Sequence, residues 1–429
     1  MKNKNYINKL SSNESQIRLS PRITVLDNGI TVITDEIPYL ESFSLGIGIS
    51  VGSRDDWNGK NGLAHFLEHS VYRRTENRTS RQIAIQLDSV GAYSNAYTTK
   101  ELTLFYVRAT KFHFNKCFDI LADIILHPIF LKNEIEKERQ IIIEEIKSYD
   151  DDPEEYIFDV ADEVIFPNNP LGLSIDGTIN SLNSITTDDL EAFHKQFYQP
   201  QNIVIAVSGN IPNDKVVDTV MMYFADKCNY GEKIKRDTPN PIIQNKIINK
   251  PIQQAHLIFG KQIFGANHPD KYTLSLLNII FGDGLSSRLY QNLREKQGLA
   301  YSVFSQLNLF SDCGSVYHYI ATDKSKIEKA EESIYKELIE LKNNKVKKTE
   351  FSRAKEQYKT AKILEFESVS ARMQNLIKNQ IVSQKIETLH DIICSIDKIT
   401  IDDIVRVIEN YYNENNLSKI LLLPKNNGK

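Results

Sequence analysis

Hydrophobic and polar residues alternate along much of the first 110 positions, as they do in half-buried strands. The runs 23–26 and 30–34 flank Asp27-Asn28-Gly29, and an Asn-Gly dipeptide between two such runs is a strong signal for a β-hairpin. Further strands are expected at 43–51, 92–98 and 102–109. The pattern therefore predicts a mostly antiparallel sheet.

Segments with helical periodicity follow these strands. Residues 63–72 and 79–90 are expected to form two helices, and Ile83, Ile85 and Leu87 mark the expected apolar face of the second one. Longer helices are predicted at 116–126 and 131–149, and another strand at 203–209. Hairpin-connected strands with helices in pairs are typical of an α+β domain in which helices cover one face of the sheet.

The same order of elements recurs in the second half. Strands are expected at 255–259, 300–309 and 314–321, and helices at 272–280, 287–297, 324–342 and 349–366. A polar stretch with several prolines separates the halves. We therefore expect two homologous domains of class α+β, at 1–230 and 251–429, joined by a linker at 231–250.

Length and composition argue against a nucleic-acid-binding protein and against a membrane-spanning one. A length of 429 residues fits two or three domains, and a net charge of -4 argues against a protein that mainly binds nucleic acid. No apolar run is long enough to predict a membrane span. The four cysteines form no C-x-x-C pair, which fits a reducing compartment. The N-terminus lacks the apolar core of a secretory signal, so the expected location is the cytoplasm, or the interior of an organelle if the gene is organellar.

The pentapeptide His65-Phe66-Leu67-Glu68-His69 carries the clearest chemical signal. Helix positions four apart lie about 6 Å apart along the axis and nearly on the same face, so both imidazoles can bind one metal ion. Glu68 lies on the adjoining edge, within reach of a water on that ion. Zinc suits two nitrogens and one oxygen. The alternative interpretation is a pair of surface histidines.

A third ligand is expected from an acid on a second helix. The helix predicted at 131–149 offers Glu134, Glu136, Glu138, Glu144 and Glu145. Such a charge run is usually a solvated face, and spacing alone does not choose among these acids.

The H-x-x-E-H motif, followed by the stretch from Glu138 to Glu145, resembles the inverzincin metallopeptidases. These include pitrilysin, insulin-degrading enzyme and the mitochondrial processing peptidase, and the likeness is to processing-peptidase-like, half-size bacterial members. Further matches cover nearly the whole chain, at 26–30, 51–54, 94–98, 101–103, 170–172 and 177–178. The resemblance implies that Glu145, 76 positions after His69, is the third zinc ligand and that Glu68 is the general base. It also implies that Glu138 supports the zinc ligands without binding the metal itself.

The second half resembles the same family over 281–301. There the resemblance implies that Arg294 and Tyr301 bind the substrate backbone and stabilise the tetrahedral intermediate. Without the family, Arg294 is typical of a surface ion pair and Tyr301 of a strand packing residue. The segment 274–280 carries no metal motif, so the second domain is expected to complete a substrate chamber without a metal.

The resemblance also implies substrate contacts in the first half. Asn95 and Ala96 lie on a strand that is expected to pair edgewise with an extended peptide. Glu155 and Asp159 occupy the positions of acids that hold a substrate arginine in the processing-peptidase branch, and two carboxylates suit a guanidinium group. The alternative is an exposed acidic helix start. The chain departs from the family at Ser70, at Arg73-Arg74 and in a glycine-rich stretch that keeps only Gly282 and Gly284.

We therefore expect a zinc metalloendopeptidase that cleaves unfolded peptides or presequence-like segments and binds one Zn²⁺ per chain. The resemblance further implies a dimer with a composite site, in which one subunit supplies the zinc ligands and its partner supplies Arg294 and Tyr301. Either a homodimer or a heterodimer with a related subunit satisfies this expectation. The alternative is a catalytically silent core or scaffold subunit of a larger complex. The other seven histidines are expected to be structural or surface residues.

Overall fold

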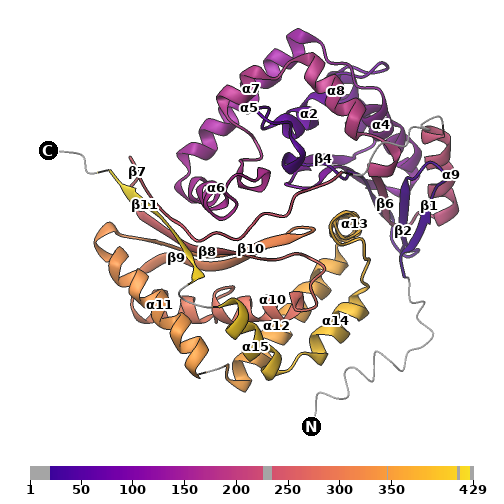
Figure 1. Cartoon of the computed structure of the whole chain (residues 1–429). Helices are drawn as coiled ribbons and strands as arrows, with labels where there is room; N and C mark the ends of the chain where they lie inside the picture. Colours follow the sequence, from indigo (N-terminus) through magenta and orange to yellow (C-terminus); the bar gives the residue numbers. More distant parts are fainter. Residues whose placement is uncertain (1–19, 226–233, 345, 413–415, 426–429) are drawn as a thin grey trace, which may run out of the picture.

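The chain forms two sheets, each flanked by helices, in a computed structural model that describes residues 20–225, 234–344, 346–412 and 416–425 (Figure 1). The first sheet has the strand order β1-β2-β6-β3-β5-β4, and the second has the order β7-β11-β8-β10-β9. This arrangement confirms the predicted α+β class with two domains.

The first sheet is built from β1 (Arg22–Val25), β2 (Thr31–Glu36), β3 (Ser42–Ile49), β4 (Tyr93–Thr98), β5 (Thr103–Thr110) and β6 (Ile203–Gly209). All neighbouring strands are antiparallel except β2 and β6, which are parallel. Strand β4 lies at the edge and pairs with β5 alone among the described strands. One side of β4 is therefore open to a further strand.

The second sheet contains β7 (Asn245–Lys250), β8 (Ala255–Phe264), β9 (Ala300–Leu309), β10 (Cys313–Thr322) and β11 (Ser418–Pro424). Only β7 and β11 are parallel in it. Strand β7 falls inside the predicted linker 231–250, because its polar, half-exposed edge position gives it no run of apolar residues. The domain boundaries themselves stay a prediction.

Helices of the first half cover one face of its sheet. This half contains α2 (Leu63–Val71), α3 (Ser80–Asp88), α4 (Phe114–Leu126), α5 (Lys132–Asp151), α6 (Pro153–Ile165), α7 (Ile179–Ser184), α8 (Thr187–Phe197) and α9 (Asn213–Phe224), with 3-10 turns η1 (Ser53–Asp55), η2 (Lys111–His113), η3 (Pro170–Gly172) and η4 (Pro200–Asn202). The predicted apolar face of the 79–90 helix was partly wrong. Ile83 and Leu87 are buried but Ile85 is 54% exposed, because only residues three or four apart share a helix face.

Helices of the second half cover one face of the second sheet. This half contains α10 (Lys271–Phe281), α11 (Ile327–Asn344), α12 (Lys348–Glu367), α13 (Val369–Lys378), α14 (Leu389–Lys398) and α15 (Ile401–Tyr411), with a 3-10 turn η6 (Lys324–Lys326) and the π-helical segments η5 (Tyr290–Lys296) and η7 (Asn379–Ser383). The helix predicted at 287–297 is thus largely π-helical.

One helix of each half packs on the sheet of the other half (Figure 1). Helix α6 packs on β8 and β11, where Ile157, Val160 and Val164 are buried. Helix α13 packs on β3 and β6, where Met373 and Ile377 are buried. The two halves are therefore joined by hydrophobic cores as well as by the chain.

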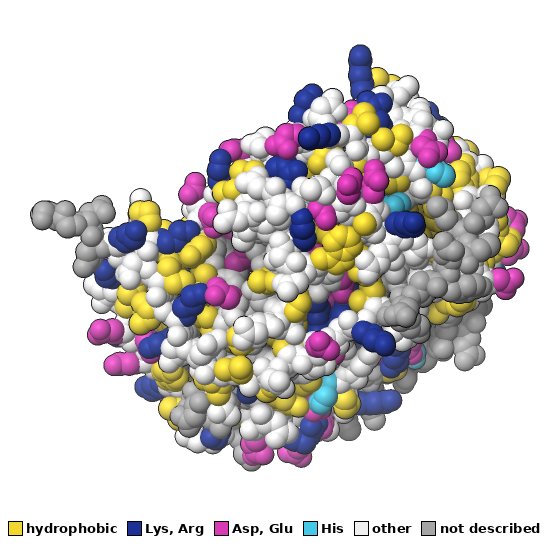
Figure 2. All heavy atoms as spheres, turned by 45° about the horizontal axis from the view of Figure 1, so that its top comes forward, with side chains coloured by type: hydrophobic (Ala, Val, Ile, Leu, Met, Phe, Trp, Pro, Cys, Tyr) yellow, Lys and Arg dark blue, Asp and Glu magenta, His cyan; other side chains and the backbone are white. Residues whose placement is uncertain are grey.

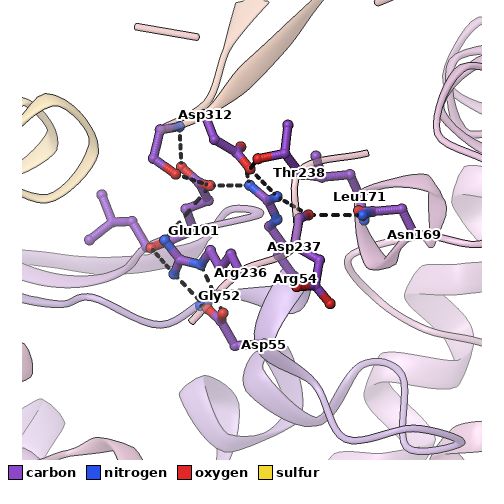
Figure 3. A network of polar contacts seen from close by, with 12 residues as sticks. Gly52, Arg54, Asp55, Glu101, Asn169, Leu171, Arg236, Asp237, Thr238 and Asp312 are labelled. Carbon is purple, nitrogen blue, oxygen red and sulfur yellow. Dashed lines mark hydrogen bonds and ion pairs between the residues drawn. The ribbon is translucent and has the colours of Figure 1, made fainter. Parts of the chain in front are cut away.

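A buried network of charges also joins the halves (Figure 3). Arg54 donates to Glu101 at 2.6 Å and to both carboxylate oxygens of Asp312 at 2.7 and 2.8 Å. Arg236 donates to Asp55 at 2.7 Å and lies 3.7 Å from Glu101. The side chains of Arg54 and Glu101 are both 2% exposed. Because Asp312 lies between β9 and β10, Arg54 fixes the second sheet against the turn between β4 and β5.

The outer surface carries charges of both signs. Acidic and basic side chains are interspersed on the face shown in Figure 2, in keeping with the net charge of -4. Within the described part of the chain, no helix combines the length and the apolar character that crossing a bilayer requires.

The Arg54 network yields a stability prediction. Replacing Arg54 with Met keeps the side-chain length but removes the main cation that binds the buried carboxylate of Glu101 and the partly exposed carboxylate of Asp312, so we expect a loss of about 3 kcal/mol in the free energy of unfolding. Urea denaturation followed by circular dichroism measures it. The control is Lys147→Ala, which breaks the exposed pair with Glu144 and is expected to cost less than about 1 kcal/mol. Equal effects of the two substitutions would contradict a structural role for Arg54.

Candidate metal centre

Helix α2 presents its polar residues from a fixed position in the core. Leu63, Phe66 and Leu67 are fully buried, and the helix packs against α5 and α8. The Asp56 carboxylate accepts from the backbone N–H groups of Gly62 and Ala64 at 2.7 and 2.8 Å, which satisfies donors in the first turn. The histidines of α2 are therefore held by a rigid element.

The structure brings His65, His69 and Glu145 together. One ligand atom from each lies within 4.8 Å of the others. The two Nε2 atoms are 3.1 Å apart, and His69 Nε2 is 3.8 Å from Glu145 Oε2. Two nitrogens bound tetrahedrally to zinc lie roughly 3.3 Å apart. The donor set and its spacing therefore fit a zinc ion.

The Nδ1 atoms of both histidines face carboxylates. His69 Nδ1 is 3.0 Å from Glu138 Oε1, and His65 Nδ1 is 3.2 Å from Asp176 Oδ1. Glu138 is buried, and its second oxygen lies 3.1 Å from Arg73 Nε. Each ring thus directs Nε2 toward the candidate metal position and Nδ1 toward an acid.

The electrostatic surroundings of the two histidines differ. Burial and the neighbouring His69 lower the pKa of His65 to about 3, so this ring is neutral at ordinary pH. Burial also acts to lower the pKa of His69, but the hydrogen bond to Glu138 and the charges of Glu68, Glu138 and Glu145 outweigh it and raise the pKa. A neutral imidazole is the form that binds a metal.

Glu68 lies beside this group with its orientation fixed. Thr98 on β4 donates from its hydroxyl to Glu68 Oε2 at 2.9 Å. The side chain is buried, and burial raises its pKa. A carboxylate with a raised pKa is suited to accept a proton and release it again.

The candidate metal site opens into a cavity of about 360 Å³ with acidic walls. Glu155 and Asp159 of α6 line it together with Glu145, Glu68 and Asp176. No described residue that lines it is a Lys or an Arg or comes from the second half. Burial raises the pKa of both Glu155 and Asp159. The cavity is therefore a favourable environment for a cation.

Strand β4 forms one wall of this cavity. Ala96, Tyr97 and Thr98 line it, whereas Asn95 is exposed and does not. Of the predicted pair, Ala96 is at the cavity, and both residues are on the open edge strand.

Arg294 and Tyr301 lie together in the second half but do not line the metal cavity. Arg294 Nη1 donates to the Tyr301 carbonyl oxygen at 2.7 Å, and its guanidinium carbon lies 5.4 Å from the centre of the Tyr301 ring. Tyr301 is 77% exposed. The structure thus leaves both side chains accessible at the surface.

Sequence reasoning missed Thr98 and Asp176 as site residues. Thr98 lies within one of the matched stretches, but nothing in the pattern indicated a contact with Glu68. Asp176 lies in a loop shortly before Gly177, and no spacing rule connects it with His65. Their roles depend on how distant segments pack.

Two family models match the chain, and the second match begins within the first half. The family described as Insulinase (Peptidase family M16) matches residues 31–179, and the one described as Peptidase M16 inactive domain matches residues 184–358. The first match contains the histidine motif, and the second covers part of the half without it.

Curated relatives match over nearly their full length. The chain is 32% identical over 400 residues to the uncharacterized zinc protease YmxG of Bacillus subtilis, and 35% identical over 403 residues to an uncharacterized zinc protease of Rickettsia felis. Each alignment covers 93% of this chain and 97% of the relative.

Solved structures share the fold. A protease from Helicobacter pylori has a TM-score of 0.88 at 22% identity, covering 94% of this chain and 100% of that one. A Pseudomonas fluorescens structure described as a peptidase M16 inactive domain has a TM-score of 0.89 at 19% identity, covering 96% and 100%. At these identities the likeness concerns the fold alone.

Proposed function

Because the chain belongs to peptidase family M16, we propose that it is a zinc-dependent metalloendopeptidase. The observation that carries the proposal is the convergence of His65, His69 and Glu145 beside the buried carboxylate of Glu68. The relatives named zinc proteases support zinc as the metal.

The proposed chemistry divides between the metal and the chain. His65, His69 and Glu145 would hold the zinc ion, which would lower the pKa of a water molecule and polarise the scissile carbonyl. Glu68 accepts the proton of the attacking water and passes it to the leaving amine. The hydrogen bond from Thr98 holds Glu68 in the orientation for this transfer.

The competing proposal is a catalytically silent subunit of a larger complex. The complete set of candidate ligands together with Glu68 favours an enzyme, since a scaffold needs no buried proton acceptor. Metal content separates the two proposals, because a scaffold is expected to purify without stoichiometric zinc.

The main prediction concerns peptide hydrolysis. The purified protein is expected to cleave a mixture of unfolded peptides, to lose activity with a chelator and to regain it with zinc, with products identified by mass spectrometry. Glu68→Gln is expected to lower kcat about 10²- to 10⁴-fold while zinc binding persists. Glu144→Gln is the matched control, because Glu144 neighbours the proposed ligand but pairs with Lys147 at the surface. Cleavage that is insensitive to chelator, or absent from zinc-loaded protein, contradicts the proposal.

A composite site between two subunits is the second part of the proposal. Tyr301 is 77% exposed and Arg294 beside it is half-buried, and no described residue of the second half lines the cavity at the candidate metal site. We infer that a partner subunit supplies these two side chains, with Tyr301 donating its hydroxyl proton to the developing oxyanion. One chain carries both sets of residues, so a homodimer suffices.

Mixing two inactive variants tests the composite site. When equal amounts of Glu68→Gln and Tyr301→Phe subunits exchange, half of the dimers contain one subunit of each kind. In each of these heterodimers one of the two sites is intact. Activity is therefore expected to recover to about a quarter of the wild-type level. Each variant alone is the control. No recovery after demonstrated subunit exchange, or an active monomer by native mass spectrometry, contradicts assembly across subunits.

The walls of the cavity favour a basic residue near the cleaved bond. Glu155 and Asp159 face the cavity from α6, and the open edge of β4 is able to bind an extended peptide through its backbone. We propose unfolded, arginine-containing or presequence-like peptides as substrates.

Substrate preference gives a further prediction. With Glu155→Gln and Asp159→Asn combined, kcat/KM for arginine peptides is expected to fall roughly 10- to 100-fold, because hydrogen bonds to charged groups are lost. Peptides with citrulline in place of arginine keep the shape without the charge and are expected to change little. Glu163→Gln, on the same helix but paired with Lys246 outside the cavity, is the control variant. An unchanged ratio of arginine to citrulline cleavage contradicts this preference.

A further inference from the structure

Asp176 makes a contact with His65 that resembles the contact of Glu138 with His69. Its Oδ1 atom lies 3.2 Å from His65 Nδ1, and the two side chains are 17% and 9% exposed. His65 Nδ1 is buried and makes no hydrogen bond of ordinary geometry with a described residue. Asp176 therefore offers the acceptor within reach of that nitrogen.

The loop that carries Asp176 is anchored from two sides. The buried Lys100 donates from Nζ to the Leu173 carbonyl oxygen at 2.6 Å and lies 3.2 Å from Asp162. Ser174 of this loop lines the same cavity as Asp159 of α6. The position of Asp176 is thus tied to both β4–β5 and α6.

Two glycines bring this loop against the start of α2. A Cβ atom on Gly62 would lie 2.5 Å from the Asp176 carbonyl oxygen, and one on Gly177 would lie 2.2 Å from the Asn61 carbonyl oxygen. Both glycines have positive φ angles, of +88° and +76°. The backbone of Asp176 thus packs directly on the residue that precedes the helix bearing His65.

We propose that Asp176 is a positioning residue for His65. Its carboxylate accepts a hydrogen bond from Nδ1–H, which fixes the tautomer and holds the lone pair of Nε2 toward His69 and Glu145. A carboxylate in this position also makes the histidine a stronger ligand. The inference rests on the proposed function, because it concerns the same metal site, and it gives each histidine its own acid.

The alternative is that Asp176 only adds negative charge to the cavity. Glu155 lines the same cavity but makes no ion pair with either histidine in the described structure. Comparing charge removal at the two positions therefore separates hydrogen bonding from general electrostatics.

The experiment measures metal binding by the full-length protein. Zinc affinity is determined by competition with a chromophoric chelator for wild type, Asp176→Ala, Asp176→Asn and Glu155→Gln at one fixed pH. The Ala variant is expected to bind zinc about 10- to 100-fold more weakly. The Asn variant is expected to lose less, because its amide oxygen still accepts from Nδ1–H, and Glu155→Gln is expected to change little.

Cobalt substitution provides a second readout. The visible absorption bands of the Co²⁺ form report ligand geometry, and we expect them to shift in Asp176→Ala but not in Glu155→Gln. If circular dichroism shows that the Ala variant does not fold, the zinc affinity of Asp176→Asn is compared with that of Glu155→Gln instead. Weaker binding by the Asn variant then supports the inference. Wild-type affinity in both Asp176 variants, or equal weakening by Glu155→Gln, overturns the inference. A wild-type protein that binds no zinc instead refutes the proposed function itself.

Discussion

Helix α6 lies in two environments at once, and this constrains the arrangement of the whole molecule. Its apolar face, with Ile157, Val160 and Val164, is buried against the second sheet. Glu155 and Asp159 on its polar face line the cavity at the candidate metal site. Burying such aliphatic side chains stabilises a fold by about 1.5–3 kcal/mol each, so the docking of α6 on the second sheet determines where the two carboxylates lie.

The second half therefore takes part in the site without providing a candidate ligand. Tyr317 on β10 donates its hydroxyl to Asp162 of α6 at 2.5 Å, and Asp162 lies 3.2 Å from Lys100. Lys100 in turn holds the loop that leads to Asp176. Together with Arg54, which binds Asp312, these contacts connect the second sheet to α6 and to the turn between β4 and β5.

The parts of the site that depend on local geometry were predictable from the sequence. The spacing of His65 and His69 on one helix face needs only the helical repeat, and the structure brings the two rings together with Glu145. Their role as metal ligands stays a prediction. The choice of Glu145 among five acids depends on how α5 crosses α2, and only family resemblance supplied it.

Contacts between distant segments explain the remaining differences from the sequence-based predictions. The sequence of β7 does not predict a strand, and its pairing with β11 is visible only in the structure. The sequence of α6 indicates an acidic helix start, and only the structure shows that its apolar face packs on the second sheet. Asp176 was missed because a loop reaches His65 only through the close packing of Gly62 and Gly177.

The cluster of carboxylates in the cavity finally indicates what the fold is built to hold. Glu68, Glu145, Glu155, Asp159 and Asp176 line one small space, and no described residue that lines it is a Lys or an Arg. Burial, and then the charge of Glu145, raises the pKa of Asp176 to about 7. Such a group of acids is unfavourable by itself, because buried like charges repel each other. Cations relieve that repulsion, so the cavity is complementary to positive charge, as the divalent ion and the basic substrate residue that we propose both require.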